Sequence, residues 1–162
     1  MTIVVMGVSG CGKSTTGKAL AERIAGRFHD ADDYHTPANI QKMSAGQPLD
    51  DTDRLPWLKT LNTLLRQAHA DNQPLVLACS ALKQSYRNLL QKDLKTSIQW
   101  VHLKADLDSI HKRMTNRTDH FMPAELLQSQ FDALEEPDDA IIIDANLPAE
   151  QIVEYIYAAI RN

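Results

Sequence analysis

A glycine-rich segment near the start of the chain constrains the fold more than any other feature. Residues 7–14 read Gly-Val-Ser-Gly-Cys-Gly-Lys-Ser and match the pattern G-x-x-x-x-G-K-[ST] at every fixed position. An apolar run over 2–6 precedes them, and a helical pattern over 13–25 follows. A strand, glycine turn and helix in this order direct main-chain N–H groups and the positive end of the helix dipole at an anion. The segment therefore predicts a phosphate-binding loop.

Two side chains of this loop suit a nucleotide and its metal ion. Lys13 is long enough to reach the outer phosphates, and the hydroxyl of Ser14 is a ligand for Mg²⁺. Cys11 is expected to be a small filler and not a nucleophile. We call residues 7–15 the phosphate loop. The residues expected to contact the nucleotide there are Gly7, Val8, Ser9, Gly10, Cys11, Gly12, Lys13, Ser14 and Thr15.

The segment 116–119 bears on the identity of the nucleotide base. Its sequence, Asn-Arg-Thr-Asp, resembles the guanine signature N-K-x-D but lacks the lysine and follows a helical pattern instead of a strand. None of the six glycines has an aspartate three residues before it, so the chain has no D-x-x-G switch. We therefore expect ATP and not GTP.

Short apolar runs alternate with helical patterns along the chain. Further strands are expected to end near Phe28-His29 and to cover 75–79, 98–103 and 140–144. Helices are expected over 36–45, from a cap at Asp51 or Asp53, over 84–91, from about 106, from Pro123, and at the C-terminus. Strands that are apolar on both faces predict a parallel sheet covered on both sides. The expected fold is one three-layer α/β/α domain over 1–162 with a five-stranded parallel sheet.

Composition excludes several classes of protein. The chain of 162 residues carries 17 Lys and Arg against 21 Asp and Glu, a net charge of −4, which gives no basic field for nucleic acid. It lacks an apolar run of the roughly 20 residues that span a bilayer, and its start has no secretory pattern. Cys11 and Cys79 form neither a disulfide framework nor a zinc spacing. We expect a reduced, cytoplasmic protein with no nucleic-acid or membrane partner.

Charged residues at other predicted strand ends suit an acceptor for the phosphoryl group. Asp30 and Asp32 are two residues apart, so in an extended segment both side chains point to the same side. One carboxylate can then hold the water shell of Mg²⁺ while the other orients a hydroxyl. The alternative is an acidic turn in solvent. Arg54 suits a substrate carboxylate or an ion pair with its acidic neighbours. Arg113 and Arg117 share one helix face and predict a lid at about 113–125, or else a basic face in solvent.

Several blocks of sequence resemble the small gluconate kinases (gluconokinases), relatives of shikimate kinase and the nucleoside monophosphate kinases. The resemblance covers nearly the whole chain. Besides the opening Met6–Ser14 it includes Asp30-Ala31-Asp32 with His35, and then Asp53-Arg54. The most specific blocks are Cys79-Ser80-Ala81-Leu82-Lys83 with Tyr86-Arg87, and Gln130-Phe131-Asp132-Ala133-Leu134-Glu135-Glu136-Pro137.

The resemblance implies a function and a set of roles. It implies a P-loop kinase fold with a helical lid, and phosphoryl transfer from ATP to the 6-hydroxyl of D-gluconate in a cytoplasmic, Mg²⁺-dependent homodimer. Catalysis is assigned to Lys13, Asp32 and Arg117, nucleotide binding also to Arg113 and Arg117, and the metal to Ser14 and Asp30. The residues assigned to the substrate are Asp32, His35, Arg54, Lys83, Arg87 and His120.

Two other functions remain open at this point. The first is a kinase for another small anionic acceptor, such as shikimate or a nucleoside monophosphate. The second is a nucleotide-binding module without transfer activity. The acidic pair and the lid arginines favour an enzyme, because binding alone does not need them. Two positions depart from the family pattern: Asp33-Tyr34, where apolar residues are common, and Thr118-Asp119, where a more basic lid is expected.

Overall fold

The computed structural model describes residues 1–115 and 124–162. Its strands are β1 (Thr2–Met6), β2 (Arg27–Asp30), β3 (Leu75–Ala78), β4 (Gln99–Lys104) and β5 (Ile141–Asp144). Its helices are α1 (Lys13–Arg23), α2 (Pro37–Ser44), α3 (Asp51–Ala70), α4 (Gln84–Gln91), α5 (Leu107–Thr115), α6 (Ala124–Ala133) and α7 (Ala149–Ile160), with a short 3₁₀ turn, η1 (Ala31–Tyr34).

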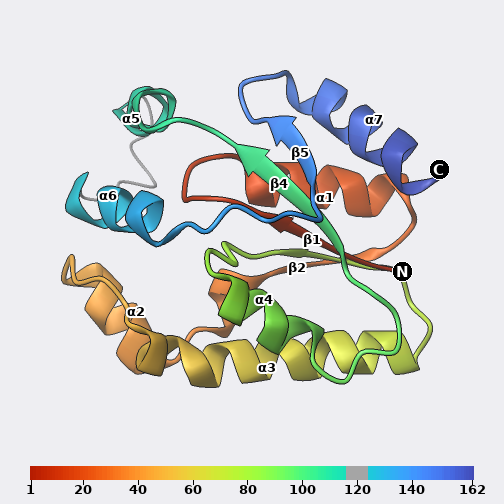
Figure 1. Cartoon of the computed structure of the whole chain (residues 1–162), viewed down its shortest axis with the longest axis horizontal. Coiled ribbons are helices and arrows are strands. Elements are labelled where there is room, and N and C mark those ends of the chain that lie inside the picture. The colour runs from red at the N-terminus through yellow and green to blue at the C-terminus, as the bar shows by residue number, and fades with distance from the viewer. Residues whose placement is uncertain (116–123) are drawn as a thin grey trace.

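The five strands form one parallel sheet in the order β2-β3-β1-β4-β5. Helices cover both of its faces, with α1 and α7 on one and α3 and α4 on the other (Figure 1). Alternate residues of β1 serve the two cores: Ile3 and Val5 pack toward α1 and α7, while Val4 and Met6 pack toward α3. The three-layer α/β/α fold with a five-stranded parallel sheet is therefore confirmed.

The edge strands differ from the inner strands in burial. Every residue of β1 and β3 is buried, as the continuous apolar runs predicted. In contrast, the residues of β2 are partly or fully exposed, and in β5 only Ile143 is buried while Ile142 is 53% exposed. The apolar run of β5 is therefore only partly buried, and β2 is neither continuously apolar nor buried; both are edge strands, which have a neighbour on one side only.

The cap of α3 also differs from the sequence prediction. The N-cap is Asp50, whose carboxylate accepts from the N–H of Asp53 at 2.8 Å, while the Asp53 carboxylate accepts from the N–H of Asp50 at 3.0 Å. This reciprocal pair is a capping box, which satisfies two N–H groups at the start of the helix. Asp51, one of the two residues expected to cap, is thereby left to face the site.

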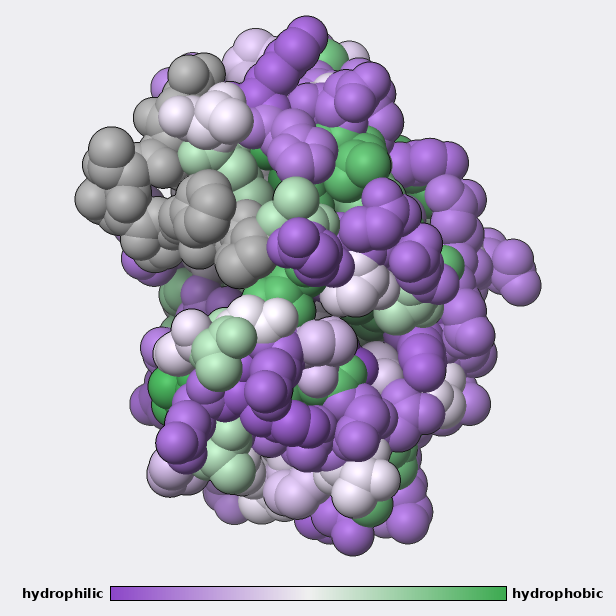
Figure 2. All heavy atoms as spheres, turned by 90° about the vertical axis from the view of Figure 1, so that its left-hand side faces the viewer, coloured by the Kyte–Doolittle hydropathy of each residue, from purple (hydrophilic) through white to green (hydrophobic). Residues whose placement is uncertain are grey.

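The carboxyl ends of the strands meet at one edge of the sheet. The phosphate loop follows β1 there, and the 3₁₀ turn follows β2 (Figure 1). Figure 2 looks onto this side of the molecule, and hydrophilic residues dominate its lower part. The predicted start of a helix at Pro123 and most of the predicted lid lie outside the described residues. Within the described ranges, each helix is too short or too polar to cross a membrane.

Candidate active site

The backbone of the phosphate loop depends on three glycines. Gly7, Gly10 and Gly12 have φ values of 145°, 82° and 96°, a region that residues with a side chain rarely adopt. A Cβ atom on Gly7 would lie 2.8 Å from the carbonyl oxygen of Leu103 and 2.8 Å from Sγ of Cys11. Gly12 is the N-cap of α1, so the loop runs directly into the N-terminus of a helix. The glycines thus allow a tight backbone turn immediately before a helix N-terminus, the part of a helix that favours anions.

One carboxylate joins the phosphate loop to the strand end beside it. Asp30, at the end of β2, accepts the Ser14 hydroxyl on Oδ2 at 2.5 Å and the N–H of Asp32 on Oδ1 at 2.9 Å. A hydroxyl and a carboxylate side by side are the oxygen ligands that Mg²⁺ prefers. In the described ranges no group of three or more His, Cys, Asp and Glu residues could hold a metal. A metal here would therefore also need oxygen atoms from phosphates or water.

Asp32 lies in the 3₁₀ turn that follows, and we call residues 30–35 the acceptor turn. The surrounding protein and then the negative charge of Asp30 raise the pKa of Asp32, and Lys13 partly offsets them. The side chain is 85% exposed, so water screens these effects. The acceptor turn adjoins the phosphate loop, because Asp30 contacts both the Ser14 hydroxyl and the backbone of Asp32.

His35 ends this turn as a buried, neutral side chain. Its ring stacks on Trp57 with 4.2 Å between centroids, and its Nδ1 lies 3.3 Å from the Asn39 amide nitrogen. Burial and then the charge of Arg54 lower the pKa of His35 to about 4. With Asn39 donating to Nδ1, the ring proton sits on Nε2, which lies 3.9 Å from an oxygen of Asp32. His35 is thus a neutral hydrogen-bond donor beside Asp32.

Arg54 and Lys83 line an open pocket of about 390 Å³ at the start of α3. Arg54 donates to the carbonyl of Leu49 at 2.7 Å and to the Tyr86 hydroxyl at 3.0 Å. Tyr86 in turn donates to Asp51, which also pairs with Lys83 at 3.0 Å. We call this space the acceptor pocket; its walls are Pro48, Leu49, Asp50, Asp51, Thr52, Arg54, Lys83, Ser129 and Ala133.

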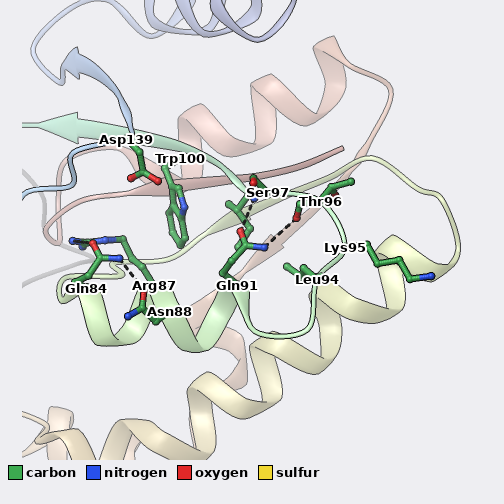
Figure 3. A pocket seen from close by; sticks show the side chains of 11 residues that line it. Gln84, Arg87, Asn88, Gln91, Leu94, Lys95, Thr96, Ser97, Trp100 and Asp139 are labelled. Carbon is green, nitrogen blue, oxygen red and sulfur yellow. Dashed lines mark hydrogen bonds between the residues drawn. The ribbon is translucent and has the colours of Figure 1, made fainter.

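Arg87 is placed differently from the expectation that it contacts the substrate. The residue is 2% exposed, and its guanidinium donates to the carbonyls of Ala81 at 2.7 Å and Glu135 at 2.9 Å. Arg87 belongs to α4, and its side chain is in the wall of a second pocket that Trp100 also lines (Figure 3), whereas it does not line the acceptor pocket. Ala81 has a positive φ of 45°, so the arginine holds a strained turn just before Lys83.

Arg113 does lie at the phosphate loop, as expected. Its guanidinium donates to the carbonyl of Gly10 at 3.3 Å and to that of Ala145 in the β5–α7 loop. It thus connects the phosphate loop with the loop after β5. The other two residues expected on this side, Arg117 and His120, lie outside the described residues.

Gln130 is a contact of the phosphate loop that the sequence reasoning did not assign. Its Oε1 accepts from the N–H of Ser9 at 2.7 Å, and its Nε2 donates to the Ser9 hydroxyl at 3.0 Å. The only sequence signal was its place in the block that begins Gln-Phe-x-x-Leu-Glu. Both polar groups of Ser9, a residue expected to bind nucleotide, are engaged in this contact.

Comparisons with known proteins agree with this geometry. A family model described as shikimate kinase matches residues 9–161. The chain is 44% identical to a probable gluconokinase of Mus musculus over 90% of this chain and 91% of that one. It is 47% identical to a gluconokinase of Gluconobacter oxydans, over 85% and 76% of the two chains.

A solved structure is also similar to this chain over most of its length. The crystal structure of a gluconokinase from Sinorhizobium meliloti superposes with a TM-score of 0.90 at 42% identity, covering 99% of this chain and 91% of that one. The match covers almost the whole chain, so it extends over both the amino-terminal and the carboxyl-terminal parts of the fold. The chain belongs to the shikimate kinase family and, within it, to the gluconokinases.

Proposed function

We propose that the chain is an ATP-dependent gluconokinase that phosphorylates the 6-hydroxyl of D-gluconate and releases 6-phosphogluconate and ADP. The observation that carries the proposal is the carboxylate of Asp30, which contacts both Ser14 and the backbone of Asp32. It brings an acidic turn for an alcohol directly against a loop for phosphates. The gluconokinases to which the chain is similar supply the identity of the alcohol.

The donor side holds the triphosphate mainly with the backbone. N–H groups of the phosphate loop and the start of α1 surround the phosphates, and Lys13 adds a positive charge. In the structure Lys13 Nζ rests on the carbonyl of Val8 at 3.0 Å, within the loop itself. Ser14 and Asp30 would hold Mg²⁺, which neutralises charge on the phosphates when it is bound. Arg113 borders this side through Gly10.

The acceptor side activates and aligns the alcohol. In the proposed reaction the proton of the substrate's 6-hydroxyl passes to the carboxylate of Asp32. The hydroxyl oxygen forms a bond to the γ-phosphorus of ATP, and the bond between the γ-phosphorus and the oxygen of ADP breaks. The side chain of Asp32 is exposed, so an alcohol can reach its carboxylate, which accepts the proton. His35 donates from Nε2 to a neighbouring hydroxyl of the polyol. The phosphoryl transfer itself then requires mainly positioning and charge stabilisation.

The acceptor pocket supplies the positive charge that a sugar acid needs. Arg54 is held by Leu49 and Tyr86, and Lys83 is held by Asp51, so both cations have fixed positions. A guanidinium binds a carboxylate through two parallel hydrogen bonds. We assign the carboxylate of gluconate to Arg54 and Lys83, and we assign Arg87 to the support of the turn before Lys83. Arg117 and His120 remain proposed contacts of the lid at about 113–125.

The remaining parts of the proposal concern the assembly and its location. We infer one kinase domain over 1–162, a homodimer, a cytoplasmic location and a requirement for Mg²⁺, all from the resemblance to the gluconokinases. Light scattering on the purified protein tests the dimer. A titration of activity with Mg²⁺ in the presence of a chelator tests the metal.

A coupled assay of ADP release tests the proposed reaction directly. The acceptor panel is D-gluconate, its epimers, shikimate and nucleoside monophosphates, with ATP and Mg²⁺ throughout. We expect D-gluconate to give the highest kcat/KM. Higher kcat/KM with shikimate or a nucleotide would reassign the acceptor, and ATP binding without any acceptor-dependent ADP release would identify a binding module.

A further inference from the structure

We propose that Gln130 is a positioning residue through which helix α6 links the acceptor pocket to the phosphate loop. The proposal rests on the proposed function, because it assumes that these two regions hold the two substrates. Gln130 acts through Ser9 and is not a catalytic residue. Its effect is expected in how strongly one substrate improves the binding of the other.

The first observation is the two-point contact between Gln130 and Ser9. The Ser9 N–H and hydroxyl bind the two ends of one amide group, at 2.7 Å and 3.0 Å, so the contact fixes both the position and the rotation of that part of the loop. Ser9 lies between Gly7 and Gly10, where the backbone has few constraints of its own. A side chain 121 residues away therefore helps set the conformation of the phosphate loop.

The second observation is that the same helix forms part of the acceptor pocket. Ser129 and Ala133 line that pocket together with the cations Arg54 and Lys83. Ser129 precedes Gln130 directly, and Ala133 follows one turn later, so all three move with the same turn of α6. A substrate that fills the pocket thus contacts the helix that holds the phosphate loop.

The end of α6 is also attached to the segment that carries Lys83. The N–H of Glu135 donates to the carbonyl of Leu82 at 2.8 Å, and the N–H of Gln84 donates to the Glu135 carboxylate at 2.8 Å. These two bonds lie on either side of Lys83 in the sequence. The position of α6 therefore depends on the same segment that supplies a cation to the acceptor pocket.

These contacts predict a coupling between the two substrates. Filling the acceptor pocket fixes α6, and α6 fixes Ser9 through Gln130, so the nucleotide then meets a loop that is already ordered. Coupling between two sites is reciprocal, so the nucleotide improves acceptor binding by the same factor. Typical coupling factors lie between about 5 and 150.

The test compares nucleotide binding with and without the acceptor. The dissociation constant of a non-hydrolysable ATP analogue with Mg²⁺ is measured by calorimetry, alone and with saturating D-gluconate. In the wild-type protein we expect gluconate to tighten the analogue by about fivefold or more. In Q130A we expect this factor to fall to less than about twofold, while binding of the analogue alone changes by less than about threefold.

Two further variants separate positioning from folding. Q128A is the matched control, because Gln128 lies on the same helix and contacts only Asp132, at 2.9 Å, in the described part of the chain; its coupling factor should equal that of the wild type. S9A removes the hydroxyl contact and keeps the N–H contact, so its factor should lie between those of the wild type and Q130A. If Q130A does not fold, S9A still tests the proposal.

The outcomes that overturn the inference are distinct from those that overturn the function. An equal coupling factor in the wild type, S9A and Q130A would refute the role of Gln130, and so would a wild-type factor of one. A loss of analogue binding in Q130A without gluconate would assign it to nucleotide affinity alone. Absence of gluconate phosphorylation by the wild type would refute the proposed function, and the coupling is then measured with the acceptor that the panel identifies.

Discussion

The phosphate loop and the acceptor pocket lie at the same edge of the sheet, but the first is formed by the backbone and the second by side chains. The phosphate loop is a backbone structure whose conformation depends on three glycines with positive φ. The acceptor pocket is a side-chain structure in which Arg54, Tyr86, Asp51 and Lys83 hold one another. A backbone site tolerates few substitutions at its glycines, whereas a side-chain site changes its ligand when its charged groups change. In the function we propose, the first region therefore defines a phosphate-binding class, and the second defines the substrate.

The largest effect is expected at the one side-chain cation of the phosphate loop that we assign to catalysis. Lys13→Met removes the positive charge that stabilises the transferring phosphoryl group, and we expect kcat to fall by about 1000-fold. Lys18→Met is the control, because Lys18 is exposed on α1 outside the loop. A loss of kcat below tenfold in Lys13→Met would mean that the backbone N–H groups supply the charge stabilisation alone. The phosphate loop would then depend on its backbone even more than we propose, in contrast to the acceptor pocket.

The next effect is expected at the acceptor turn. Asp32→Ala removes the proposed proton acceptor, and we expect kcat to fall by at least about 100-fold, within the range of general-base catalysis. Binding of the ATP analogue should change little, since Asp32 belongs to the acceptor side. Asp33→Ala is a matched control in the same 3₁₀ turn. Near-normal turnover of Asp32→Ala would show that another group accepts the proton.

A smaller and more selective effect is expected in the acceptor pocket. Arg54→Lys keeps the charge but loses the fork that binds a carboxylate through two bonds, so the KM for gluconate should rise by about tenfold, the equivalent of one charged hydrogen bond. The KM for ATP should stay within about twofold. Steady-state kinetics with each substrate varied in turn measures both constants, and Arg66→Lys on the exposed side of α3 is the control. Equal changes in both KM values would contradict a pocket that is specific for the acceptor.

The smallest effect concerns the pH dependence of stability. His35 has a pKa of about 4 in the folded chain against about 6.5 when unfolded. Between these values the unfolded chain binds a proton that the folded chain does not, so the free energy of unfolding falls as the pH is lowered from about 6.5 to about 4. The slope from this one group is at most about 1.4 kcal/mol per pH unit.

Chemical denaturation of His35→Gln at several pH values isolates this contribution. The variant should show a flatter decline than the wild type in this window. A residual decline is expected, because burial also lowers the pKa of His29 and His102. Identical slopes in the variant and the wild type would mean that His35 is accessible to protons in the folded state.

The two regions also differ in how far sequence alone predicted them. The backbone of the phosphate loop, a glycine turn between a strand and a helix, was predicted because glycine spacing reports local backbone geometry directly. The contacts of Arg87 with the carbonyls of Ala81 and Glu135 were not predicted, because a long side chain can turn to either side of its helix and Glu135 is distant in the sequence. Gln130 was not assigned because its partner lies 121 residues away.

The fold shows the same division between local and distant determinants. Continuous apolar runs predicted the inner strands β1 and β3, whose burial follows from composition. The exposure of β2 and β5 depends on strand order, which no single segment encodes. The cap of α3 was assigned to Asp51 or Asp53 because the aspartates nearby are chemically equivalent. Asp50 caps because it alone has the extended backbone at the helix start, with φ −93° and ψ 179°.

The shared carboxylate of Asp30 limits how such an enzyme can acquire a new substrate. One of its oxygens serves the hydroxyl of Ser14, and the other supports the backbone of Asp32. Replacing Asp30 would remove its contacts with the Ser14 hydroxyl and with the Asp32 backbone in a single mutational step, so the roles we propose for these two residues cannot be optimised independently. Divergence toward other alcohols, or laboratory redesign, would have to leave this residue untouched and proceed through the far wall of the pocket, at Arg54 and Lys83.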